Sequence, residues 1–118
     1  MASYSKVLLS GSTNGKGIKV AATSSPGTTI HTAINNETDL DELWLWAVNS
    51  STVDVKLTIQ YGGTTAVDND IEFTVVAEDG LKIILPGPLL NNSLVVKAWA
   101  GTADVLVIYG YVNRITAA

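Results

Sequence analysis

Two neighbouring segments of the chain differ in how apolar and polar positions follow one another. Residues 53–61 alternate between apolar and polar side chains, which is typical of a strand with one face on a core and one in water. Residues 43–48 are apolar at every position, which is typical of a strand buried on both faces. Because a strand of a small β-sandwich needs only one buried face, we expect a partner subunit to cover the other side of 43–48.

Short apolar stretches separated by turn residues predict eight or nine strands, at 4–9, 18–22, 28–34, 40–48, 53–61, 71–75, 81–85, 94–100 and 105–113. Proline at position 86 is expected to end the 81–85 strand. Strands at a spacing of roughly ten residues predict one all-β domain, an antiparallel two-sheet sandwich of jelly-roll type. An immunoglobulin-like sandwich is the alternative. Residues 1–17 are predicted to form an N-terminal arm or loop region, and 18–118 the sandwich.

Three segments carry apolar residues on both faces: 43–48, 94–100 and 105–112. An open apolar patch of this kind is unusual on a soluble monomer, so we predict a homo-oligomeric or assembly interface. The alternatives are that the loops at 10–17 or 62–70 fold over the patch, or that it forms a ligand groove. Tryptophan and tyrosine favour an interface. The predicted interface residues are Trp44, Trp46, Val48, Trp99, Leu106, Ile108 and Val112.

Composition narrows the function classes. The net charge is −4 and the seven Lys and Arg are scattered singly, which argues against a nucleic-acid partner. The absence of cysteine excludes disulfides, thiol catalysis and cysteine-based zinc sites. The apolar runs are far shorter than the ~20 residues of a membrane helix, and no signal-peptide core follows the first methionine. We expect neither a membrane partner nor export by such a signal.

Candidate chemistry is sparse. His31 is the only histidine, so a metal site or a catalytic triad has little support, and we expect a strand or subunit-contact residue there. No catalytic, cofactor-binding or metal-ligating residue is predicted, and the chain is predicted not to be an enzyme. The acidic segments 39–42 and 68–72 leave calcium open, although neither has EF-hand spacing. Tryptophans on a sandwich could instead stack on sugars, as in a small carbohydrate- or surface-binding module.

Several stretches of the chain resemble small structural proteins of tailed bacteriophages: 30–33, 41–49, 55–65, 92–98 and 109–115. The resemblance spans most of residues 28–115 and is closest to capsid decoration (cement) proteins, with a tail, neck or head-fibre protein as the alternative. It implies a non-enzymatic homo-oligomer, often a trimer, that binds the major capsid protein. Such a protein lies on the head surface of a virion assembled in the host cytoplasm. The two-faced strands would make the self-contact, and residues 1–17 would grip the shell.

Overall fold

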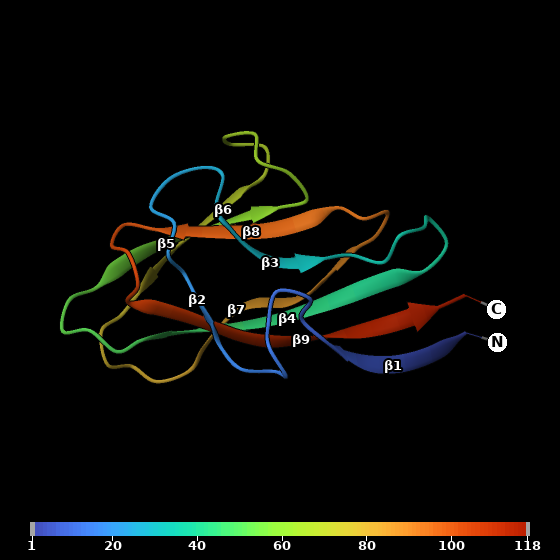
Figure 1. Cartoon of the computed structure of the whole chain (residues 1–118), viewed down its shortest axis with the longest axis horizontal. Coiled ribbons are helices and arrows are strands. Elements are labelled where there is room, and N and C mark those ends of the chain that lie inside the picture. The colour runs from blue at the N-terminus through green and yellow to red at the C-terminus, as the bar shows by residue number, and fades with distance from the viewer. Residues whose placement is uncertain (1, 118) are drawn as a thin grey trace.

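The computed structural model describes residues 2–117, which form nine β-strands and no helix (Figure 1). The strands are β1 (Ser3–Leu8), β2 (Ile18–Lys19), β3 (Thr28–Thr32), β4 (Leu40–Asn49), β5 (Val55–Tyr61), β6 (Asp70–Val75), β7 (Lys82–Leu90), β8 (Val95–Ala100) and β9 (Leu106–Thr116). The part of the chain that the structure describes therefore holds no helix with the length and apolar character needed to span a membrane.

The strands form two antiparallel sheets. Sheet A has the order β1-β9-β4-β7, with β2 also paired to β9, and sheet B has the order β3-β8-β5-β6. Four of the pairs are nested, since β2 pairs with β9, β3 with β8, β4 with β7 and β5 with β6. The nested pairs together form one long antiparallel hairpin. The hairpin is rolled up, so that β9 also pairs with β4 and β8 also pairs with β5. The arrangement is a jelly roll, which confirms the predicted fold rather than the immunoglobulin-like alternative.

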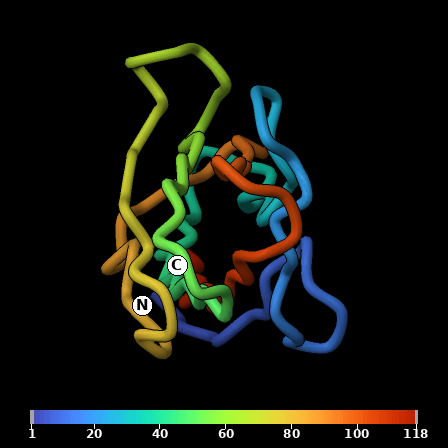
Figure 2. The backbone as a smooth tube through the Cα atoms, turned by 90° about the vertical axis from the view of Figure 1, so that its left-hand side faces the viewer, coloured from blue at the N-terminus to red at the C-terminus, as the bar shows by residue number. Residues whose placement is uncertain are grey.

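The core lies between the two sheets. Figure 2, seen from one end of the molecule, shows how the backbone surrounds the space that the core side chains fill. In β4 every second side chain is buried: Asp41, Leu43, Leu45, Ala47 and Asn49 face inward, and the residues between them are only half-buried. The run 43–48 is therefore an ordinary one-sided strand in its burial. The outer face of this run, formed by Trp44, Trp46 and Val48, is apolar and lies at the surface of sheet A, half-buried.

The orientation of β9 corrects part of the predicted interface. Leu106, Ile108 and Val112 are 0 % exposed and lie in the core, so a partner cannot contact them. Val112 pairs with Leu43 and Ile108 with Ala47, and directly opposed residues of antiparallel strands share a face. Because both faces of this strand are apolar, parity within the strand could not tell which face was inside.

The N-terminal segment is not a separate arm. Residues 3–8 form β1, which pairs with β9 at six consecutive positions, from Ser3 with Thr116 to Leu8 with Tyr111. The connection that follows is also attached, since the Gly11 amide donates to the Ile30 carbonyl of β3. The first half of the predicted arm is thus part of sheet A.

Proline 86 does not end its strand, contrary to expectation. β7 continues through Pro86, Gly87 and Pro88 to Leu90. It lies at the edge of sheet A and, among residues 2–117, pairs only with β4, so one side of its backbone needs no hydrogen-bonded partner.

Candidate functional site

A buried polar cluster, formed by His31, Asp41 and Arg114, joins three strands of the two sheets. The Asp41 side chain is 0 % exposed, and its carboxylate accepts hydrogen bonds from Arg114 Nε at 2.7 Å and Arg114 Nη2 at 3.0 Å. The backbone amide of Ile34 donates to the same carboxylate at 3.1 Å, and His31 Nε2 lies 2.8 Å from it. Asp41 is therefore fully hydrogen-bonded, as a buried carboxylate must be.

The hydrogen bonds around His31 assign its tautomer. The Ser10 backbone amide donates to His31 Nδ1 at 3.0 Å, so Nδ1 is an acceptor. The proton of the neutral ring then lies on Nε2 and is donated to Asp41. The ring thus connects the turn after Leu9 to the carboxylate of β4.

The surroundings of the cluster shift the pKa values of Asp41 and Tyr61 in opposite directions. Burial raises the pKa of Asp41, but the hydrogen bonds from Arg114 and His31 and the charge of Arg114 lower it more, and the net value lies below the usual 3.8. Burial, together with the negative charge of Asp41, raises the pKa of the Tyr61 phenol to about 12. Both groups therefore favour one charge state: Asp41 ionised and Tyr61 neutral.

This cluster is built for holding strands together and lacks the parts of a catalytic site. His31 and Asp41 are both buried, so no substrate reaches the pair. The hydroxyl of Ser10 accepts a hydrogen bond from the Thr32 amide and does not bond the imidazole. His31 lies in strand β3, which is one of the two positions expected for it, and its side chain is in the core. The sequence analysis did not find this cluster. Its signal is that Asp41 and Arg114 are polar residues at positions whose side chains point inward in otherwise apolar strands.

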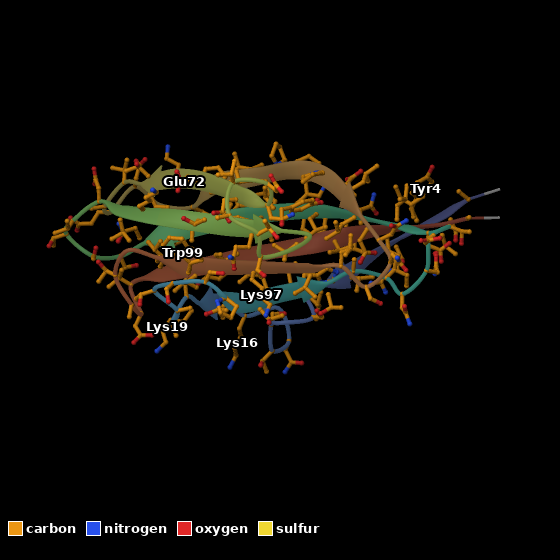
Figure 3. The ribbon with its side chains drawn as sticks, turned by 90° about the horizontal axis from the view of Figure 1, so that it is seen from above. Tyr4, Lys16, Lys19, Glu72, Lys97 and Trp99 are labelled. Carbon is orange, nitrogen blue, oxygen red and sulfur yellow. The ribbon has the colours of Figure 1, made fainter. Side chains whose placement is uncertain are left out.

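Part of the outer face of sheet B is covered by the chain itself, while Lys56, Glu72 and Thr74 on the same face remain exposed. The Gln60 side chain accepts a hydrogen bond from the Gly27 amide at 2.9 Å and donates one to Ser25 Oγ at 2.8 Å. These bonds hold the 22–27 segment over the sheet. Trp99 is half-buried on this face, directly opposite Thr58, which is completely buried (Figure 3). Trp99 therefore lies on the opposite side of the sandwich from the other two tryptophans.

The outer face of sheet A carries a group of aromatic rings, which we call the aromatic face: Trp44, Trp46, Tyr109 and Tyr111. Trp44 is directly opposite Tyr111, and Trp46 is opposite Tyr109. The rings of Trp46 and Tyr111 stack with centroids 6.1 Å apart. The indole N–H of Trp44 donates to the Glu42 carboxylate, and the ring packs close to Gly87.

The rim of the aromatic face is open to solvent. Tyr109 is 41 % exposed, and Ile83, on the far side of Trp46, is 51 % exposed. Leu8 of β1 is also exposed, next to Tyr111 in the register. Val48 and Val107 extend the face toward the end of the sheet.

The structure divides the predicted interface residues among three places. Trp44, Trp46 and Val48 lie together on the outer face of sheet A. Trp99 lies on the outer face of sheet B, and the three β9 residues lie in the core. The β9 residues that do share the aromatic face are Val107, Tyr109 and Tyr111, which have the opposite parity to the predicted set.

The acidic segments hold no recognisable metal centre. Within residues 2–117, no three or more His, Cys, Asp or Glu side chains lie close enough to hold a metal ion. In the segment 39–42, Asp41 is bound to Arg114, and Asp39 accepts from the Ala117 amide. A cavity of about 350 Å³ beside the 62–69 loop is lined by Asp70 and Glu72, but Glu72 is paired with Lys56 at 2.8 Å.

Comparisons with known proteins identify no relative of this chain: no family model, no curated protein and no solved structure matches it. Function is therefore argued from the chemistry of the surface, where the aromatic face is the main candidate. The His31–Asp41 pair is enclosed, and the outer face of sheet B is partly covered by the 22–27 segment and groups no comparable set of rings.

Proposed function

We propose that this chain is a non-enzymatic structural protein that associates with copies of itself through the aromatic face. We further propose that its setting is a bacteriophage particle, where it acts as a decoration (cement) protein on the outer surface of the head, favoured as a trimer. The aromatic face carries the first proposal, because it groups stacked aromatic rings within an exposed apolar rim, whereas the outer face of sheet B carries the 22–27 segment and an exposed Lys56–Glu72 ion pair. The resemblance of residues 28–115 to phage structural proteins supports the second.

The energetics favour self-association through this face. Large aromatic side chains dominate the binding energy of protein interfaces, and each buries about 150–250 Å² when covered. Full burial of an exposed apolar side chain is worth roughly 1.5–3 kcal/mol, and the rings of this face, which are already partly buried on the sheet, would gain a part of that each. The rings are already ordered by stacking and by the Trp44–Glu42 hydrogen bond, so association loses less side-chain entropy.

Two lysines placed on the rim test the self-contact without disturbing the core. Tyr109 and Ile83 flank Trp46 on either side and are both exposed. We expect the double variant Tyr109→Lys/Ile83→Lys to shift the mass measured by light scattering toward the monomer across micromolar concentrations. The matched control is Thr74→Lys on the exposed outer face of sheet B, which should leave the mass unchanged.

Two results would contradict the self-contact. One is a wild-type protein that remains monomeric at micromolar concentration. The other is a folded double variant with the wild-type mass. Circular dichroism and thermal unfolding establish that each variant is folded, so that loss of the oligomer is not confused with loss of the sandwich.

The phage setting has its own test. Purified protein should co-sediment with phage heads that lack decoration, and should bind the major capsid protein rather than tails or necks. Co-sedimentation with tail structures alone would favour the tail, neck or head-fibre alternative. No sedimentation with any phage particle would remove the phage setting and leave the self-contact standing.

A sugar chain is the second candidate for the aromatic face. A row of polar side chains, Lys6, Asn113 and Glu42, lies in register beside the row that contains Tyr111 and Trp44. Rings that stack on a sugar, with polar groups beside them for its hydroxyls, are the usual chemistry of a carbohydrate-binding surface. Binding to an insoluble polysaccharide that is lost in Tyr109→Lys/Ile83→Lys, with no change of mass, would favour this candidate.

A further inference from the structure

Most sheet edges of this fold are protected against pairing with another strand. β7, at one edge of sheet A, contains Pro86 and Pro88, and its register with β4 shifts at two places. Prolines and irregular registers are standard means of preventing edge-to-edge association. This edge is therefore a poor template for a further strand.

Sheet B is protected at both of its edges. At β3, residues of the connection between β1 and β2 already use the free backbone groups: the Gly11 amide donates to the Ile30 carbonyl, and the Thr32 amide donates to Ser10 Oγ. The register of β3 with β8 is also irregular. β6 carries two carboxylates, Asp70 and Glu72, which repel a second copy of the same edge.

β1 has none of these protections. Its six residues pair with β9 in an unbroken register, and they include no proline and no carboxylate. Its one charged residue, Lys6, places its ammonium group 4.7 Å from the centre of the Tyr111 ring, over the sheet. Among residues 2–117, the recorded backbone hydrogen bonds of β1 are those of its ladder with β9. β1 lies at the margin of the sheet in Figure 1, and Tyr4 marks its projecting end in Figure 3.

We propose that β1 pairs antiparallel with β1 of a second copy of this chain, about a two-fold axis that passes beside Ser5. The unpaired side of an edge strand is a template for strand addition, and an antiparallel pair of identical strands satisfies both copies equally. This contact does not rest on the aromatic-face contact proposed above, because it uses the backbone edge of sheet A and not its face.

The side chains select this register among those that two-fold symmetry allows. Centring the pair on Ser5 places Tyr4 opposite Lys6 of the other copy, twice per dimer, which is a favourable cation–aromatic pairing. Centring it on Lys6 would oppose two lysines directly. Centring it on Tyr4 would shorten the overlap to a few residues. In the favoured register residues 3–7 of each copy overlap.

The pairing has a consequence for the rest of the surface. A two-fold axis perpendicular to the sheet keeps the outer faces of both copies on the same side. The aromatic faces would then form parts of one continuous surface, built on four strands of each copy in the order β7-β4-β9-β1. A partner that binds the aromatic face would meet two such faces side by side.

A cysteine placed on the axis tests the geometry directly, because the natural chain has no cysteine. In Ser5→Cys the two Cβ atoms face each other about 4.5–5.5 Å apart, close enough for a disulfide after a small adjustment. In the control Ser3→Cys the two cysteines are offset by four positions, about 13 Å along the strand. Under mild oxidation we expect at least about tenfold more covalent dimer from Ser5→Cys than from Ser3→Cys. Equal yields, or none from Ser5→Cys, would overturn the proposal.

A charge exchange tests the register in solution. In Tyr4→Lys, the new lysine of each copy lies opposite Lys6 of the other copy, which makes two like-charge pairs per dimer. The variant should shift the dimer toward monomer in sedimentation equilibrium. Adding Lys6→Glu creates two opposite-charge pairs and should restore the dimer. A dimer that is unaffected by Tyr4→Lys, or that is not restored by the second change, contradicts the register.

The edge contact and the face contact can fail separately. Cross-linking of Ser5→Cys is repeated in the Tyr109→Lys/Ile83→Lys background, where the face contact is removed. We expect the cross-link to persist there. Its loss in that background, with the protein folded, would show that β1 does not pair by itself and would overturn the edge proposal. Its persistence, with an unchanged mass for the face variant, would overturn the face contact instead.

Discussion

The two outer faces of the sandwich both carry tryptophan, yet they lie in different surroundings. On sheet B, Gln60 binds the 22–27 segment, which covers part of the face, and Thr58 is buried beside Trp99. On sheet A, Trp44 and Trp46 lie among other aromatic rings whose rim is exposed. The difference shows that two outer faces with tryptophan can differ in exposure because the chain's own loops cover parts of one of them.

The largest loss of stability is expected on substitution of Asp41, whose carboxylate links His31 of sheet B to Arg114 of sheet A. Asp41→Ala leaves Arg114 and His31 without their partner, and breaking a buried ion pair costs about 3–5 kcal/mol of the free energy of unfolding. Both outer faces should then lose their order together. Urea unfolding at pH 7 measures the loss. The variant Asp41→Asn, which keeps the size of the side chain, should be destabilised in the same direction.

The pH dependence of the same site gives a second measurement. The pKa of Asp41 is lower in the folded protein than the usual 3.8, so its stabilisation is complete above that value. The stabilisation is lost as the pH falls from about 4 through the folded pKa. Urea unfolding between pH 7 and pH 2 should show this loss in the wild type and a smaller one in Asp41→Asn. Parallel curves for the two proteins would contradict the assignment.

Removing the cover of sheet B should make its outer face resemble that of sheet A. Gln60→Leu deprives the Gly27 amide of its acceptor, at a cost of about 1–3 kcal/mol. Hydrogen exchange at Gly27 should become faster, and Trp99 fluorescence should become more accessible to a quencher. Unchanged exchange at Gly27 would mean that the segment is held by other contacts.

A tyrosine on the inner side of sheet B is expected to have a small effect that depends on pH. The Tyr61 hydroxyl makes no hydrogen bond to another described residue, so Tyr61→Phe should change stability at pH 7 by less than about 1 kcal/mol. Its pKa is raised from 10 to about 12, so the wild type should lose stability as the pH rises through this interval. The variant should lack this loss in denaturant titrations at pH 9 and pH 12.

The smallest effects compare two lysines, one on each outer face. Lys6 lies over the Tyr111 ring, and Lys56 pairs with Glu72 at 2.8 Å, with both of these charged side chains exposed. Substitution of either lysine by Met should cost about 0.2–1 kcal/mol. Exposed ion pairs are screened by salt, and the Debye length at 1 M ionic strength is only ~3 Å. The effect at Lys56 should therefore disappear in 1 M NaCl. An effect at Lys56 that persists in high salt would contradict its assignment as a surface ion pair.

Residues in β4, β7 and β9 show how much of the fold and site is predictable from the sequence. The strand positions and the jelly roll follow from alternation and turn chemistry, and β4 was placed within one residue. The outward position of Trp44 and Trp46 was also foreseen. The orientation of β9 was not, because its two faces are equally apolar and only pairing with β4 decides between them. Proline 86 was misjudged because its effect depends on whether the strand lies at an edge.

The sequence by itself determined the fold class, the placement of strands and the surplus of apolar surface. These properties depend on neighbouring residues along the chain, through the two-residue period of strands and the turn residues between them. The tertiary structure alone decided which apolar face stays open, which edge strand is unprotected, and that His31, Asp41 and Arg114 meet. Those properties depend on register and on contacts between residues far apart in the chain, which no local pattern specifies.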